Sequence, residues 1–244
     1  MDKMESIPGW RALLSNEEMA GVMRASGGVI CAAGDGLAPA DKKLYSLRDV
    51  TGTVEAIPLI ASSIMSKKIA EGADGLVLDV KTGNGAFMSD LARAQKLART
   101  MVEIGNDAGV RTRALITAMD VPLGLAVGNA IEVTESLEVL AGGGPADLIE
   151  LVIALANEML DIAGIDADPR EAITSGRAMD HWRRMVTAQG GDPNAPLPEA
   201  RHQHVITAPV AGPLSTLEAY GVGVAAWRLG AGRAQRDDEI IHGA

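Results

Sequence analysis

The stretch GLVLDVKTGNGAF, residues 75–87, decides the fold of this chain. Its first part, GLVLDVK, is an apolar run of the kind found in strands that are buried on both faces of a parallel sheet. TGNGAF then turns the chain into a helix, predicted to be capped by Ser89 and to end at Asn106, because its apolar residues keep a helical period. The next predicted strand is ALITAM, residues 114–119. Strand, helix and strand in this order predict a right-handed parallel crossover.

The ends of these strands locate the functional edge of the predicted sheet. In such sheets the ligand crevice lies beyond the carboxyl ends of the strands. TGNGAF, residues 82–87, and DVPLGLAVGN, residues 120–129, follow those ends. The glycines of TGNGAF lack the pattern of a dinucleotide-binding or P-loop motif. We therefore predict an α/β fold with a mixed, largely parallel sheet flanked by helices.

Further elements are predicted around this unit. Ser15-Asn16-Glu17-Glu18 has the spacing of a capping box, so a helix should begin at Ser15 and end at Gly27. Leu44 to Glu71 is predicted to form two helical stretches, with Pro58 at a first turn or a kink. The other predicted elements are a short strand at 28–33, helices at 130–140, 146–163 and about 169–189, a linker at 190–198, and short strands with glycine turns after it.

Composition excludes several classes of protein. The 244 residues carry a formal net charge of -10, which argues against a general binder of nucleic acid. The only cysteine, Cys31, cannot form an intrachain disulfide, which fits a reducing, cytoplasmic location. The apolar segments are too short to span a membrane, and MDKMESIPGW has no apolar run. We therefore expect neither a nucleic-acid nor a membrane partner.

Three polar residues with different head groups mark the candidate site. Arg48, Ser63 and Lys67 lie around an apolar segment, and Ser63 and Lys67 are four residues apart, on one face of a helix. A guanidinium, a hydroxyl and an ammonium suit a flat heterocycle that carries carbonyl oxygens and gains negative charge as it leaves. The alternative is that Lys67 and Lys68 form the solvated end of an amphipathic helix and that Arg48 pairs with Asp49 at the surface.

Two other features are open to a functional and a structural interpretation. Phe87, the only phenylalanine, is either ordinary core or a flat wall for a base. The loop at 122–129, with Glu135 beyond it, has carbonyl oxygens that suit a hard cation. The residues alone favour a plain turn there, with Asn129 as the cap of the next helix.

LRDVTGTVEAIPLIASSIMSKKIAEGADGLVLDVKTGNGAFM, residues 47–88, together with DVPLGLAVGNAIEV, residues 120–133, resembles the thymidine phosphorylase and pyrimidine-nucleoside phosphorylase family. The resemblance runs from Asp2 to about Ile241 and is densest between residues 41 and 135. It implies a pentosyltransferase of pyrimidine nucleoside metabolism and nucleotide salvage. The implied reaction is reversible phosphorolysis, in which inorganic phosphate and a pyrimidine nucleoside give a pyrimidine base and a pentose 1-phosphate.

The resemblance also implies roles for single residues. Arg48 and Lys67 would be catalytic, and the pyrimidine would contact the residues Arg48, Ser63, Lys67, Ile60 and Phe87. Leu123, Ala126 and Glu135 would belong to a monovalent-cation site for K+. The resemblance implies no organic cofactor, and a cytoplasmic homodimer. Residues 1–39 and 71–205 would form the α/β domain, 40–70 part of a helical lobe, and 206–244 the start of a β-rich C-terminal domain.

The family's phosphate-binding loop and catalytic histidine have no counterpart in these 244 residues. We therefore expect a fragment, without phosphate-binding residues of its own and with the C-terminal domain cut short, that is inactive in isolation. A non-catalytic module of the same fold, binding a pyrimidine or a partner, is the alternative. A related phosphoribosyltransferase is a third interpretation, which would need a pyrophosphate-binding loop.

Overall fold

The computed structural model describes residues 1–244 except 35, 42, 45–50, 52, 54–55 and 234–238. The described residues form two compact units. The sheet unit comprises residues 33–119 and 150–171, and the helical unit comprises residues 1–32, 120–149 and 172–244. No helix in the described part of the chain is long and apolar enough to cross a membrane.

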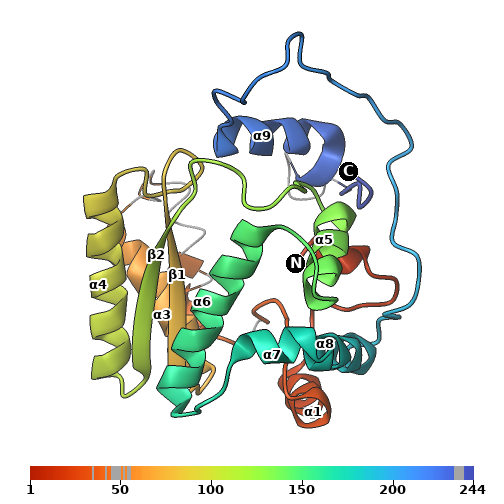
Figure 1. Ribbon diagram of the computed structural model, residues 1–244. Helices are drawn as coiled ribbons and strands as arrows, with labels where there is room; N and C mark the ends of the chain where they lie inside the picture. Colours follow the sequence, from red (N-terminus) through yellow and green to blue (C-terminus); the bar gives the residue numbers. More distant parts are fainter. Residues whose placement is uncertain (35, 42, 45–50, 52, 54–55, 234–238) are drawn as a thin grey trace. The chain divides into compact units, whose positions relative to one another are not determined.

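The sheet unit contains the predicted parallel crossover. Strand β1 (Gly75–Thr82) pairs with β2 (Arg111–Ala118) in parallel, in a register that runs from Gly75 opposite Arg111 to Thr82 opposite Ala118. Helix α4 (Leu91–Asp107) connects the two strands. The prediction of an α/β fold is therefore confirmed, with helices flanking a small parallel sheet (Figure 1).

Helices α3 (Ile57–Ala70) and α4 bury one face of this sheet. Because aromatic residues are scarce, the core is built from small and flexible side chains, which pack closely without rings. Gly105 of α4 lies so close to Thr112 of β2 that a Cβ atom there would stand 2.0 Å from the Thr112 hydroxyl oxygen. The buried core residues are Ala61, Met65, Leu78, Val80, Met88, Ala94, Leu97, Ala98 and Met101.

Helix α6 (Ala146–Ala163) contacts the alternate residues of β2. Arg113 forms ion pairs with Glu158 and Asp161 at 2.8 and 3.2 Å, and Arg111 donates to the backbone carbonyl of Ile162. Successive strand residues point to opposite faces, so Thr112 faces α4 while its two neighbours face α6. Helix α6 thus contacts the opposite face of the sheet from α4, where Arg111 and Arg113 remain exposed to solvent.

The helical unit has its own core. Its elements are η1 (Met4–Ser6), α1 (Asn16–Ser26), α5 (Ala130–Leu140), α8 (Arg177–Ala188), α9 (Ala219–Ala226) and η2 (Trp227–Ala231). The predicted capping box is confirmed, since Ser15 and Glu18 exchange hydrogen bonds at the start of α1. The buried apolar residues are Ile7, Trp10, Ala12, Val133 and Val186.

Two predicted helix boundaries are wrong. The cap of α4 is Asp90 rather than Ser89, because the Asp90 carboxylate accepts a hydrogen bond from the Arg93 amide at 2.9 Å. The helix predicted at about 169–189 is divided into α7 (Pro169–Thr174) and α8. Gly176 lies between them with a φ of 79°, a left-handed conformation that ends a regular helix.

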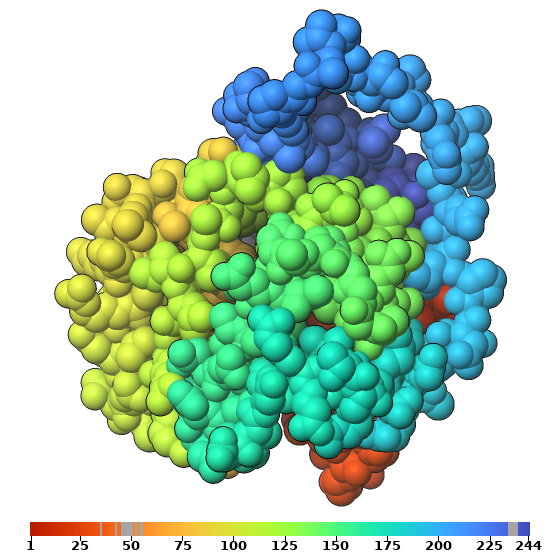
Figure 2. Space-filling view, in the orientation of Figure 1, coloured from red at the N-terminus to blue at the C-terminus, as the bar shows by residue number. Residues whose placement is uncertain are grey.

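The strands predicted outside the crossover are also wrong for the described residues. Residues 28–34 have no strand partner, because the side chain of Gln189 binds the amide and the carbonyl of Ile30 at 3.2 and 2.8 Å. Residues 198–218 are exposed and form no strand, and Figure 2 shows part of this segment in blue. Further on, α9 and η2 stand where short strands were expected.

Candidate functional site

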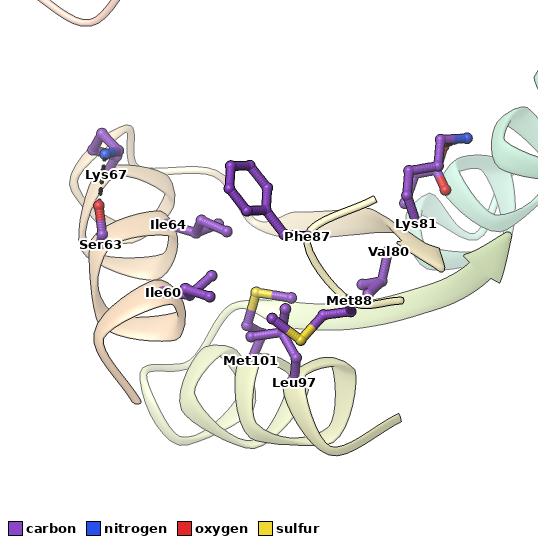
Figure 3. A pocket seen from close by; sticks show the side chains of 11 residues that line it. Ile60, Ser63, Ile64, Lys67, Val80, Lys81, Phe87, Met88, Leu97 and Met101 are labelled. Carbon is purple, nitrogen blue, oxygen red and sulfur yellow. Dashed lines mark hydrogen bonds and ion pairs between the residues drawn. The ribbon is translucent and has the colours of Figure 1, made fainter. Parts of the chain in front are cut away.

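A cavity of about 350 Å³ lies in the sheet unit, near the carboxyl end of β1 (Figure 3). It is lined from α3, from the end of β1, from the turn that follows β1 and from α4. The lining residues are Ile60, Ser63, Ile64, Lys67, Asp79, Val80, Lys81, Phe87, Met88, Leu97 and Met101. Four of the predicted pyrimidine contacts, Ile60, Ser63, Lys67 and Phe87, therefore line one cavity.

Helix α3 brings the two polar contacts together. Pro58 lies in its first turn, where a missing N–H costs no helical hydrogen bond. Ser63 and Lys67 are one turn apart, and the Lys67 ammonium donates to the Ser63 hydroxyl oxygen at 3.2 Å, the dashed line in Figure 3. Ala61 and Met65 of the same helix are fully buried in the core, which fixes the face that the helix presents.

The Lys67 ammonium has a second partner that sequence analysis missed. It forms an ion pair with Asp41 at 2.7 Å, and the Lys67 and Asp41 side chains are 29% and 12% exposed. Lys67 is therefore not a freely solvated lysine at the end of an amphipathic helix. No local spacing indicated the pair, because the partners are 26 residues apart in the chain.

The apolar wall of the cavity comes from two elements. Ile60 and Ile64 point from α3 toward the ring of Phe87 (Figure 3). Phe87 is 76% exposed, so its alternative interpretation as ordinary core is wrong, and the buried residue of this turn is Met88. A flat ring beside a polar pair suits a planar ligand, which gains apolar contact on its face and hydrogen bonds at its edge.

A second lysine lies at the strand side of the cavity. Lys81 forms an ion pair with Asp79 at 2.7 Å and donates to the Thr117 hydroxyl at 2.9 Å. Thr117 in turn donates to Asp79 at 2.5 Å, so the three side chains bind one another. Sequence analysis did not single out these residues. They could have been found from the alternation of side chains along two paired parallel strands, which places Lys81 opposite Thr117.

Arg48 lies outside the described residues. The structure therefore places two of the three polar groups, Ser63 and Lys67, in one cavity.

The predicted cation residues lie in the helical unit. The Glu135 side chain is buried in α5 and accepts hydrogen bonds from the amides of Leu125 and Ala126 at 2.8 and 3.1 Å. Gly124, between these residues and Leu123, has a φ of 70°. A Cβ atom at Gly124 would lie 2.3 Å from a Glu135 carboxylate oxygen.

The loop also differs from a plain turn into a capped helix. Asn129 precedes α5 but its side chain makes no capping hydrogen bond. Instead its amide nitrogen donates to the backbone carbonyl of Ala231 at 2.9 Å. The structure thus brings Glu135 and Ala126 into contact and places Leu123 in the same turn. Among the described residues, no group of three His, Cys, Asp or Glu side chains could hold a metal ion.

Comparison with known proteins gives the same family as the resemblance of residues 47–88 and 120–133. Residues 1–181 match the model of the glycosyl transferase family, a/b domain. Thymidine phosphorylase of Mycobacterium tuberculosis (strain H37Rv) is 57% identical over 245 residues, which cover 100% of this chain and 57% of that protein. Pyrimidine-nucleoside phosphorylase of Bacillus subtilis (strain 168) is 46% identical, and that of Geobacillus stearothermophilus is 45% identical, each over 98% of this chain and 58% of the relative.

The chain thus spans little more than half the length of the relatives that it matches. The family model covers most of the chain, which confirms the resemblance noted from the sequence. The chain belongs to the glycosyl transferase family that has this a/b domain, and its similarity there is to thymidine and pyrimidine-nucleoside phosphorylases.

Proposed function

We propose that the cavity beside α3 binds the base of a pyrimidine nucleoside and that the chain is part of a pyrimidine-nucleoside phosphorylase. The observation that carries this proposal is the pairing of Ser63 with Lys67 beside the apolar wall of the same cavity. The names of the relatives support the choice of a pyrimidine nucleoside. Inorganic phosphate is the proposed second substrate.

In the proposed reaction, a phosphate oxygen attacks the anomeric carbon of the nucleoside while the bond from that carbon to N1 of the base breaks. The bonding electron pair leaves with the base and spreads over the ring carbonyl oxygens. Donors that are already in place stabilise this charge more in the transition state than in the substrate. Lys67, which lines the cavity, would supply such a donor with its ammonium group.

Ser63 and the apolar wall would orient the base. Because Ser63 accepts from Lys67, we assign its own O–H group to a ring carbonyl of the base. Ile60 and Phe87 would contact the face of the ring. Arg48, whose sequence position matches the family's guanidinium, is proposed as the second catalytic cation beside Lys67.

Other parts of the proposal follow from the family. A K+ ion would bind the carbonyl oxygens of Leu123 and Ala126 and the carboxylate of Glu135, because hard cations prefer oxygen ligands. Residues 40–70 would belong to a helical lobe through which two copies form a homodimer in the cytoplasm. Closing such a lobe expels water and brings the two substrates together.

The experiment joins this chain to the parts of the Mycobacterium tuberculosis thymidine phosphorylase that it does not match. Release of thymine from thymidine and of uracil from uridine is then measured with phosphate present. Lys67→Met is expected to lower kcat about a hundredfold, as does the loss of one donor to developing charge in other enzymes. Lys68→Met, which changes the exposed neighbour, should leave the rate unchanged. A folded fusion that releases neither base, beside an active relative, would overturn the proposal.

A further inference from the structure

We propose that Asp41 is a positioning residue whose carboxylate holds the Lys67 ammonium at the edge of the cavity. This inference rests on the proposed function of the cavity as a pyrimidine site. It adds a residue that does not itself line the cavity and that we expect to act on the ligand through Lys67.

The contacts of Lys67 are those of an anchored ammonium. Its nitrogen lies 2.7 Å from a carboxylate oxygen of Asp41 and 3.2 Å from the hydroxyl oxygen of Ser63. The shorter bond joins two charges, which makes it the stronger of the two. The Asp41 side chain is only 12% exposed, and a carboxylate that is largely buried needs a cationic or hydrogen-bonding partner.

This anchoring matters because lysine is a flexible residue. Its side chain has four methylene groups and loses rotamer entropy when it is fixed. An ammonium has three N–H donors, and in the described part of the chain two of them go to Asp41 and Ser63. These two bonds fix the direction of the third N–H. A ligand carbonyl at that position then gains a donor without the cost of ordering the side chain.

The next lysine of α3 provides an internal contrast. Lys68 pairs with Glu71 at 3.0 Å, one turn along the same helix. Both of these side chains are more than a third exposed, and an exposed pair of this kind contributes little. Lys68 does not line the cavity. Glu71→Gln is therefore a matched control, because it removes the carboxylate partner of another lysine on the same helix.

The first experiment tests the ion pair without any ligand. The 244-residue chain is labelled with a limiting amount of acetic anhydride, and the modification of Lys67 is compared with that of Lys68 by mass spectrometry. In Asp41→Asn, Lys67 should react severalfold faster relative to Lys68, because the amine is no longer held against a carboxylate. In Glu71→Gln, only Lys68 should react faster. An unchanged ratio in Asp41→Asn would overturn the inference.

The second experiment tests the positioning role by calorimetry with uracil. Asp41→Asn should weaken uracil binding about tenfold, the size of one charge-assisted hydrogen bond, and Asp41→Glu should recover part of the loss. The effect of Asp41→Asn should disappear in a Lys67→Met background, because a positioning residue acts only through the group that it positions. Thermal unfolding of each variant identifies any loss that is due to misfolding.

The outcomes separate this inference from the proposed function. If the unmodified chain binds no uracil, the proposed pyrimidine site fails and the positioning role fails with it. If uracil binds and Lys67→Met weakens it, but Asp41→Asn does not, only the inference fails. An equal loss from Asp41→Asn in the presence and absence of Lys67 also overturns it, since Asp41 would then act independently.

Discussion

Asp41 in the sheet unit and Glu135 in the helical unit are both largely buried carboxylates, but they have different partners. Asp41 binds the ammonium of Lys67, a flexible group whose direction matters for a ligand. Glu135 binds two backbone amides, and so fixes the path of the loop at 124–126. Burial of a carboxylate therefore does not reveal its role. The partner decides whether the carboxylate orients a side chain or shapes the backbone.

Crowding Glu135 should destabilise the protein more than any other change considered below. Gly124→Ala should destabilise the protein by about 3 kcal/mol, because the new methyl group meets the buried carboxylate in a left-handed backbone conformation. Urea unfolding measures the change in the free energy of unfolding. The matched control is Gly164→Ala, where φ is 68° and no atom lies within 4 Å of the added Cβ.

Gly164→Ala places an alanine in a left-handed backbone conformation without any new contact. It should lower the free energy of unfolding by about 1 kcal/mol. Equal losses in the two variants would show that the carboxylate moves aside freely. The loop would then not be fixed by Glu135, and the contrast with Asp41 would disappear.

A smaller effect is expected from the proposed K+ site. With K+ at about ten times its dissociation constant, the free energy of unfolding should rise by about 1.4 kcal/mol relative to a choline salt of equal concentration. Glu135→Gln should abolish this rise, because it removes the only charged ligand proposed for the ion. Glu132→Gln is the control, since Glu132 binds the nearby Gly128 amide but is not a proposed ligand. A K+ response that survives in Glu135→Gln would refute the assignment of that carboxylate.

The smallest effect concerns Glu18, an exposed carboxylate that combines both kinds of partner. It accepts from the Ser15 amide and from the Arg11 guanidinium, and these bonds, with that of the Ser15 hydroxyl, lower the pKa of Glu18 from 4.5 to about 2. Because the pKa is lower in the folded state, the stabilisation is present above pH 4.5 and is lost as the pH falls toward 2.

The measurement for Glu18 is the pH dependence of unfolding. The free energy difference between the unmodified chain and Glu18→Gln should be constant above pH 4.5 and should vanish near pH 2. Ser15→Ala removes the hydroxyl, one of the groups that lower the pKa of Glu18. The pH range over which the stabilisation is lost should therefore become narrower. A free energy difference that is unchanged at pH 2 would contradict the lowered pKa of Glu18.

Local patterns predicted much of the fold. The bounds of α5 and α6 agree with the predicted ranges, because apolar periodicity and adjacent turns define a helix within its own sequence. The pairing of Ser63 with Lys67 was predictable for the same reason, since residues four apart share a helix face. The parallel crossover followed from the order of its elements.

Contacts between distant residues were not predictable in this way. The predicted strand at 28–33 does not form, and the side chain of Gln189, 159 residues away from Ile30, binds the backbone amide and carbonyl of Ile30 instead. Asp41 and Lys67 meet only through the fold, so neither residue type nor spacing indicated the pair. The exposure of Phe87 was not predictable either, because it depends on which side chain of this turn fills the core. Here Met88 fills it.

The two-stranded sheet has a consequence for handling the protein. In the described part of the chain, β1 and β2 each have a strand neighbour on one side only. An unmatched strand edge is a template on which another molecule can add a strand. The net charge of -10 opposes such stacking by mutual repulsion, which added salt weakens. Raising the concentration or the ionic strength should therefore favour aggregation of this chain.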